Sequence, residues 1–510
     1  MKHSRLIALL MALLMLLGAI PAQAEAKTSV VVGAAAEPNA FFVCHSTKGT
    51  NMDEVPIIHN IYDSLIKRNF DGSYEGLLAT EWSVSEDGLA YTLKIRQGVK
   101  FSDGSDMTVD DVVFSMNYTA STKGGKTQLT NYDRCEKVDD QTVVIYLTSP
   151  FGGFINALCN RYALIYSKAY FEKVGEDGYD AAPIGTGAYK FVEYVSGDHT
   201  TLTANEFYWG EKPAIKDVTF RVMSDVNTQM IALENGEIDV LLNANITPLM
   251  QLDPNGKVTY KTASAATFSN LQFNLKASQP TADLNLRLAI AHAINKEEVN
   301  IGTNEGLAEI GDIQMPFFFN ARPAPGTYRA IDFNLDKAKE YLAKSNYKGE
   351  EVKIVCVSGT KAEMACQIVQ GQLINLGINA TLAAVDAPTY DDYLKNSGEF
   401  CMNMRASSSS LMDCDAYYFT YDKDNLSMTY DRGLGEELDN KLTELVRAGR
   451  FEPNNEKRTA IYTEIANLVT DNGLATCLYY DLNVVAFNKD IKGVEPGALV
   501  GMYYFSDWAW

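Results

Sequence analysis

The chain has 510 residues, 46% of them hydrophobic, and a formal net charge of −21 at pH 7. A single hydrophobic core stops growing beyond roughly 250 to 300 residues, so two or more lobes are expected. The acidic balance disfavours nucleic-acid binding, because that affinity comes from Lys and Arg side chains that neutralise phosphates. We interpret the charge as that of an acidic protein kept in solution by self-repulsion.

Residues 1–24 have the pattern of an export signal. Lys2 and Arg5 form a basic start, residues 6–20 are apolar, and the small-residue cleavage pattern follows at 21–24. The apolar run is shorter than the about 20 residues that a membrane-spanning helix needs. We therefore expect a mature chain that begins near Glu25 in a periplasmic or secreted location. No cysteine stands beside the cleavage pattern, so a lipid anchor is not predicted.

The chain has eight cysteines, and none of them forms a C-x-x-C pair. Zinc-ribbon and thioredoxin-like sites are therefore excluded, and no metal site is predicted. Export permits disulfides, but buried free thiols are an equal alternative. Cys401 and Cys414 are the first pair to test, because they flank one serine-rich segment.

The densest local pattern lies between residues 60 and 117. Residues 82–85 are strand-prone, Asp87-Gly88 is a turn dipeptide, and apolar residues alternate from 91 to 95, so this segment predicts a β-hairpin. A turn cluster follows at 102–106. Thr108 and Asp111 then have the spacing of a capping box, which predicts the start of a helix.

Further elements follow from periodicity along the chain. Strands are expected at 28–36, 143–147, 191–194, 200–204, 218–222 and 474–487, and helices at 169–174, 228–234, 286–294, 334–342, 361–376 and 455–468. His292 falls inside one of these helices, where a structural role is expected. The alternation of helices and strands in the second half predicts a second α/β lobe.

Several segments, in the same order along the chain, resemble one family. They are EWSVSEDGLAYTLKIRQGVKFSDGSDMTVDDVVFSM at 81–116, PIGTGAYKF at 183–191, NEFYWGEKP at 205–213, NGEIDV at 235–240 and the helix at 286–294. The chain resembles the bacterial extracellular solute-binding proteins of family 5, which serve dipeptide, oligopeptide and nickel ABC importers. The resemblance covers nearly the whole mature chain.

This resemblance implies an α/β, bilobed periplasmic-binding-protein fold of the Venus-flytrap type II with an additional inserted domain. We expect a main lobe from residues 25–59, 182–265 and 480–510, an inserted domain at 60–181, and a second lobe at 266–479. The expected function is to capture di- or oligopeptides between the lobes and deliver them to an ABC permease and ATPase complex. A monomer without cofactor or enzymatic activity is implied.

The resemblance places the ligand contacts in the segment 401–419. By position, Asp413 would pair with a peptide ammonium group and Arg405 with a carboxylate, and Ser409, Ser410 and Cys414 lie beside them. Each buried ligand charge needs such an opposite partner. Glu37 and Asn39, in the loop after the first strand, are further candidates. The alternative is that Asp413 and Arg405 are solvated loop charges.

Here the chain departs from the family pattern, because serines replace a Gly-Trp pair and no proline follows. A second hypothesis is therefore a non-peptide solute, such as a metal chelate, a sugar or a signalling molecule, in the same fold. A remote third is a penicillin-recognising serine hydrolase, suggested by Ser64-x-x-Lys67, Ser115-Met116-Asn117 and Lys261-Thr262-Ala263. The last of these motifs lacks its glycine.

Overall fold

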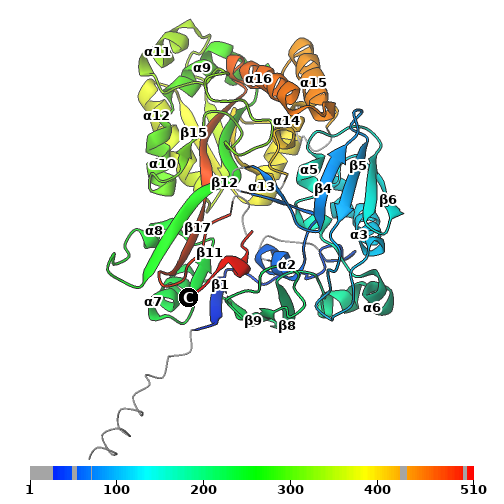
Figure 1. Cartoon of the computed structure of the whole chain (residues 1–510). Coiled ribbons are helices and arrows are strands. Elements are labelled where there is room, and N and C mark those ends of the chain that lie inside the picture. The colour runs from blue at the N-terminus through cyan, green and yellow to red at the C-terminus, as the bar shows by residue number, and fades with distance from the viewer. Residues whose placement is uncertain (1–26, 49–53, 70–71, 410, 426–432, 498–501) are drawn as a thin grey trace, which may run out of the picture.

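The computed structural model describes residues 27–48, 54–69, 72–409, 411–425, 433–497 and 502–510. The predicted signal peptide at 1–24 and the candidate Ser410 lie outside these residues. The chain is a mixed α/β protein with two lobes, as predicted (Figure 1). Two long strands, β12 (Val258–Phe273) and β17 (Ala475–Asn488), run from one lobe into the other.

One large mixed sheet passes through both lobes. Its order is β15-β14-β16-β12-β17-β11-β1-β10-β9-β8, and β13 pairs with β17. The main lobe contributes β1 (Ser29–Ala34), β8 (Tyr189–Val195), β9 (His199–Ala204), β10 (Asp217–Val222) and β11 (Val240–Leu242). The second lobe contributes β13 (Glu309–Ile310), β14 (Val352–Val357), β15 (Ala380–Val385) and β16 (Met402–Ser408).

Helices cover this sheet in both lobes. The main lobe has α2 (Val55–Ile61), α7 (Val226–Asn235) and α8 (Ile246–Leu249). In the second lobe, Figure 1 shows α9 to α12 on one side and α14 to α16 on the other. Their bounds are α9 (Leu284–Ala293), α10 (Lys296–Asn304), α11 (Leu335–Lys344), α12 (Lys361–Leu376), α13 (Ala387–Asp392), α14 (Asp415–Tyr418), α15 (Glu436–Phe451) and α16 (Asn455–Asp471).

The region predicted as an insertion has a sheet of its own. It is built from β4 (Ala79–Val84), β5 (Ala90–Ile95), β7 (Thr142–Leu147) and β6 (Tyr132–Asp139), in that order. The short pair β2 (Ile66–Arg68) and β3 (Tyr74–Gly76) precedes it, and α3 (Val109–Ser121), α4 (Lys123–Gln128), α5 (Phe154–Ala157) and α6 (Lys168–Ala181) belong to the same region.

The predicted hairpin and capping box are confirmed. Strands β4 and β5 pair antiparallel, with Trp82 opposite Leu93. At the start of α3 the Thr108 N–H donates to the Asp111 carboxylate at 2.8 Å, and the capping box is complete. The residues within these short segments were enough to predict them, because both motifs are closed by neighbours in the sequence.

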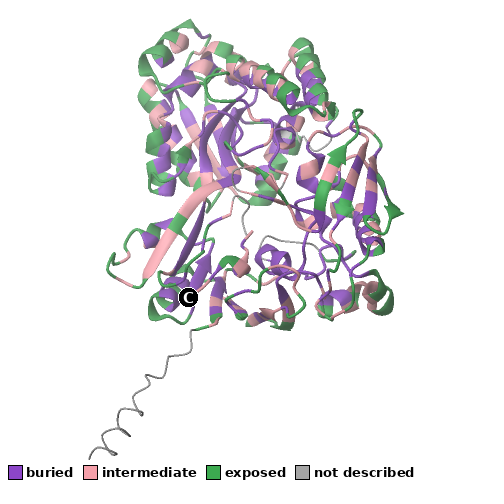
Figure 2. Cartoon of the chain, viewed as in Figure 1, coloured by how far each residue is buried: buried purple, intermediate pink, exposed green. Residues whose placement is uncertain are grey.

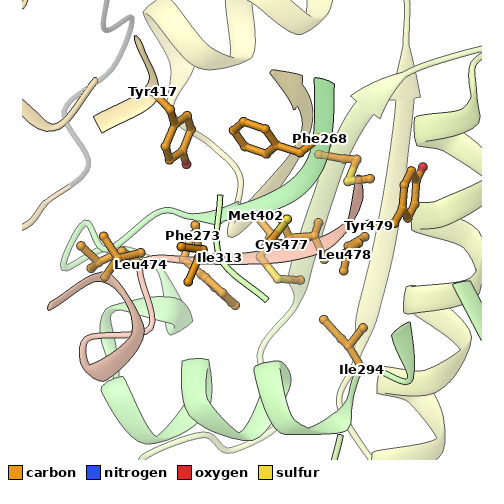
Figure 3. Packing of buried hydrophobic residues seen from close by; sticks show 14 of the residues in the cluster. Phe268, Phe273, Ile294, Ile313, Met402, Tyr417, Leu474, Cys477, Leu478 and Tyr479 are labelled. Carbon is orange, nitrogen blue, oxygen red and sulfur yellow. The ribbon is translucent and has the colours of Figure 1, made fainter. Parts of the chain in front are cut away.

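The buried hydrophobic residues form several clusters. Figure 2 shows buried residues on the central strands and on parts of the helices around them. The largest cluster fills the second lobe around β12, β16 and β17, where the ring centroids of Phe268 and Tyr417 lie 5.1 Å apart in a T-shaped contact (Figure 3). A second cluster joins main-lobe residues such as Phe220 to Tyr166 and Tyr179 of the insertion. The exact domain boundaries stay a prediction.

Two further findings concern single elements. His292 has the structural place predicted for it, because its ring nitrogen Nδ1 lies 2.8 Å from the Asp332 carbonyl oxygen and its ring stacks on Tyr341. The segment 401–419, which the sequence presented as a loop, begins with the strand β16. No helix in the described part of the chain is both long and apolar enough to cross a membrane.

Candidate ligand-binding crevice at the hinge

The two crossover strands are interrupted between the lobes. β12 and β17 pair regularly up to Ser264 with Leu482, and pairing resumes at Phe268 with Tyr480, with a second register shift between Ser269 and Asn270. Between these pairs, residues 265–267 of β12 lie opposite a single residue of β17, Asp481. Such a bulge disrupts the ladder and bends the strand. The interruption therefore marks the hinge between the lobes.

Strands of both lobes end at this hinge. β16 ends where Ser408 pairs with Thr267, and β11 ends where Leu242 pairs with Val485. β1 runs parallel to β11, and β14 runs parallel to β16. The carboxyl ends of the parallel strands from each lobe therefore face one region. Ligands of open α/β sheets bind in a crevice at such carboxyl ends.

Two cavities lie along this region, and a third is lined mainly by the C-terminal segment. The first, which we call the serine cavity, has a volume of about 230 Å³. Arg405 and Ser409, two of the predicted ligand contacts, line it. Its other lining residues are Phe268, Phe319, Ala406, Ser407, Ser408, Ala416, Tyr417 and Thr420. Arg405 and several residues with hydroxyl groups thus line one small space, and these residue types suit a polar anionic group.

The second, the carboxyl-end cavity, has a volume of about 330 Å³ and lies between the lobes. Its main-lobe wall follows the ends of β1, β10 and β11 and includes Asn243 and Asn245. Lys361, at the start of α12, contributes to the wall on the side of the second lobe. Asn243 has a φ of 52°, a left-handed conformation that Asn tolerates better than most residues. The Lys361 ammonium donates to Asn304 Oδ1 at 3.0 Å.

The third, the C-terminal cavity, has a volume of about 210 Å³. Its walls come from the C-terminal stretches 493–497 and 502–508, from Lys67, Arg68 and Asn69 of the insertion, and from Met412 of the second lobe. Arg68 donates to the carbonyl oxygens of Met412 and Phe318 at 2.9 and 2.5 Å. Three parts of the chain that are distant in sequence therefore meet at this cavity.

Asp413 lies behind these cavities rather than in the walls described above. Its side chain is 0% exposed and pairs with the equally buried Arg458. Arg458 donates two parallel hydrogen bonds to the carboxylate, at 2.6 and 3.0 Å. The side chains of Asn320 and Asn156 donate at 3.2 and 3.4 Å, and the Asp415 N–H donates at 2.9 Å. Asp413 thus joins the second lobe to α5 of the insertion.

The other predicted contacts are placed as follows. Cys414 is 0% exposed, and burial raises its pKa well above the usual range. The Glu37 carboxylate accepts hydrogen bonds from Tyr194 and Ser196, and the Tyr194 bond is the main cause of its lowered pKa. Asn39 is exposed, and its backbone N–H donates to the Glu54 carboxylate at 3.1 Å. In the loop after β1, it is Ala35 that lines the carboxyl-end cavity.

Two acids have pKa values raised by burial, Asp481 at the interruption of β17 and Asp415 in α14. The pKa of Asp481 rises to about 6, although Lys361 and a hydrogen bond from Ser269 act in the opposite direction. The pKa of Asp415 also rises to about 6, while Arg450 lowers it. Sequence reasoning missed both acids, as well as Arg458 and Lys361. The one sequence signal for the carboxyl-end cavity was the pair of amide residues Asn243 and Asn245, which come directly after the buried strand β11.

The motifs that suggested a serine hydrolase are engaged in structural contacts. The buried Ser64 hydroxyl donates to the Ile66 carbonyl at 2.8 Å, and the Ser115 hydroxyl donates to the Asp111 carbonyl at 2.7 Å. Lys261 pairs with Glu495. Each of these three polar groups thus has a structural partner within the protein.

Comparison with known proteins agrees with this geometry. The family model of the bacterial extracellular solute-binding proteins, family 5 (middle part) matches residues 73–427. The chain belongs to this family. It is an ABC-transporter substrate-binding protein at that level of description, and its relatives are binding proteins, which supports a non-enzymatic role.

Two relatives of this family 5 protein align over nearly its whole length. The dipeptide-binding protein of Escherichia coli is 23% identical, with 96% of this chain and 95% of the relative covered. The oligopeptide-binding protein AppA of Bacillus subtilis is 24% identical, with coverages of 94% and 91%. The crystal structure of the substrate-binding protein CtaP from Listeria monocytogenes matches with a TM-score of 0.83 at 22% identity, covering 95% of this chain and 99% of that one.

Proposed function

We propose that this protein captures a small polar solute with a carboxylate group, a di- or oligopeptide being the first candidate, and delivers it to an ABC permease and ATPase complex. Arg405 in the serine cavity is the observation that carries the proposal. A guanidinium group binds a carboxylate through two parallel hydrogen bonds, and neighbouring hydroxyl groups can complete its solvation. The relatives named for dipeptides and oligopeptides support the peptide as first candidate.

Capture follows from the position of the cavities at the hinge. Rotation of the lobes about the interruption in β12 and β17 changes the distance between Lys361 and the main-lobe ends of β1, β10 and β11. Hinge closure around a ligand is a common transition in binding proteins. The closed form excludes water, so the contact between Arg405 and a carboxylate gains strength.

The test compares peptides with a free and an amidated carboxyl terminus by isothermal titration calorimetry. Arg405→Gln removes the charge, and we expect a roughly tenfold to hundredfold loss of affinity for the free carboxylate, in line with about 1.5–3 kcal/mol for a charged hydrogen bond. Arg134→Gln is the matched control, because Arg134 pairs with Asp133 and Glu136 on the surface of the insertion. Equal affinities of wild type and Arg405→Gln for the free peptide would contradict the proposal.

For the ammonium group of a peptide, Asp413 remains the proposed partner. Its carboxylate already accepts hydrogen bonds from Arg458 and from three amide groups, so a ligand reaches it only if this set rearranges. Asp413→Asn should weaken the binding of free-amine peptides more than that of N-acetylated peptides. Equal effects on both would assign Asp413 to the support of the segment instead.

The alternative is a non-peptide solute in the same crevice. Native mass spectrometry of the purified protein separates the two, because a retained ligand is identified by its mass. A peptide supports the first candidate. A metal chelate, a sugar or another non-peptide mass supports the alternative.

A further inference from the structure

The insertion contacts the two lobes in different ways. Its contact with the main lobe is apolar, because the Phe42 ring packs on Tyr166 and Tyr179 with ring centroids 4.8 and 5.1 Å away. Domains within a chain move relative to one another unless the interface between them is large and hydrophobic. The shared aromatic cluster therefore joins the main lobe and the insertion into one body.

The contact between the insertion and the second lobe is polar. The Gly152 N–H donates to the Arg450 carbonyl oxygen at 3.0 Å. The Asn156 side chain, on α5, donates at 3.4 Å to Asp413, which lies just before α14 (Figure 1). We call this contact the clasp, and it consists of Arg68, Gly152 and Asn156 of the insertion with Phe318, Met412, Asp413 and Arg450 of the second lobe.

Arg68 is buried in the clasp with part of its guanidinium group unpaired. The residue is 8% exposed, and its two terminal nitrogens donate to the carbonyl oxygens of Met412 and Phe318. Among the described residues, none accepts a hydrogen bond from its Nε. A buried donor without a partner costs free energy, which contact with water recovers. Met412 adds to this cost, because its φ of 47° is unfavourable for a residue with a side chain. The docked clasp therefore gains little stability by itself.

Gly152 allows the second lobe to come this close. A Cβ at this position would lie 2.4 Å from Arg458 Nε and 2.6 Å from the Glu452 carbonyl oxygen, both of the second lobe. The φ of Gly152 lies outside the left-handed region, so alanine can adopt this backbone conformation. The docked second lobe, and not the local backbone, therefore requires glycine here.

We propose that the clasp is open in the protein without solute and closes when the second lobe rotates onto the solute. The inference rests on the proposed function, because solute capture supplies the free energy for closure. β12 and β17 join the second lobe to the main lobe, so rotation about their interruption separates the second lobe from the insertion. A solute that binds the closed form shifts the population towards it. The clasp residues then influence the affinity for the solute without contacting it.

The first test compares two glycine substitutions in the full chain, which is freed of solute by unfolding in guanidinium chloride, dialysis and refolding. The matched control is Gly185→Ala, whose Cβ would lie 2.1 Å from the Ile61 carbonyl oxygen, inside the body of main lobe and insertion. We expect Gly185→Ala to lower the melting temperature by about 2 °C or more, because this contact cannot separate. Gly152→Ala should keep the melting temperature of the wild type, because the open clasp leaves room for the Cβ. A loss in Gly152→Ala equal to that of the control would overturn the proposal.

The second test needs no variant. Amide hydrogen exchange of the same solute-free wild type is measured for two glycine N–H groups, Gly152 across the clasp and Gly187, which donates to the Ile61 carbonyl oxygen at 2.9 Å within one body. We expect Gly152 to exchange at least about tenfold faster than Gly187 after correction for the intrinsic rates, because opening exposes it to water. Equal protection of the two amides would overturn the proposal.

Both measurements are made without solute. A clasp that stays docked would therefore contradict this inference and leave the comparison of free and amidated peptides unaffected. Equal affinities of wild type and Arg405→Gln would in turn contradict the proposed function, whatever the exchange rate of Gly152.

Discussion

The ion pair of Arg458 and Asp413 offers the sharpest test of the packing between the insertion and the second lobe. Both side chains are 0% exposed. Two unit charges about 4 Å apart interact by about 4 kcal/mol at an effective dielectric constant of about 20. Arg458→Met removes the cation and leaves Asp413 buried without its counter-charge. We expect this to lower the free energy of unfolding by about 3–5 kcal/mol.

The assay is urea unfolding followed by circular dichroism, with the midpoint and slope measured for each variant. Lys344→Met is the control, because Lys344 and Glu340 form an exposed pair that contributes less than about 1 kcal/mol. The double variant Arg458→Met with Asp413→Asn should regain part of the loss, because no buried charge remains. A loss no larger than that of the control would refute the reasoning.

Three further changes have defined expectations. Burial raises the pKa of Asp481 to about 6 in the folded protein, above the value of about 3.9 in the unfolded chain. The folded state therefore gains stability from the protonated carboxyl group below about pH 4. This stability is lost as the pH rises through about 6. Asp481→Asn should therefore gain at most roughly 3 kcal/mol over wild type at pH 7.5 and little at pH 4, measured by urea unfolding at both pH values. Gly493 has a φ of 78°, and a Cβ there would lie 1.9 Å from the Asp507 carbonyl oxygen. Gly493→Ala should therefore lower the melting temperature. Gly377→Ala, where a Cβ meets no atom within 4 Å, should lower the melting temperature less. Thr108→Ala removes the capping side chain of α3 and should cost about 1 kcal/mol, seen as faster amide exchange in the first turn of that helix.

The sequence determined those elements whose contacts are close along the chain. Helix α12 has the predicted bounds 361–376, because its apolar spacing and its following Gly377 are local signals. The hairpin β4–β5 and the capping box of α3 follow for the same reason. The ordered family segments predicted the fold class, which the comparisons confirm.

Tertiary structure alone decided the site. The sequence places Asp413 only eight positions after Arg405, and both were predicted to contact the ligand. In the structure, β16 places Arg405 in a cavity wall. Asp413 is instead buried against Arg458 of α16. The hinge likewise depends on the pairing of β12 with β17, whose partners are separated by most of the second lobe. Such contacts depend on the register and packing of distant segments. Local patterns of charge and hydrophobicity carry no information about which of those segments will meet.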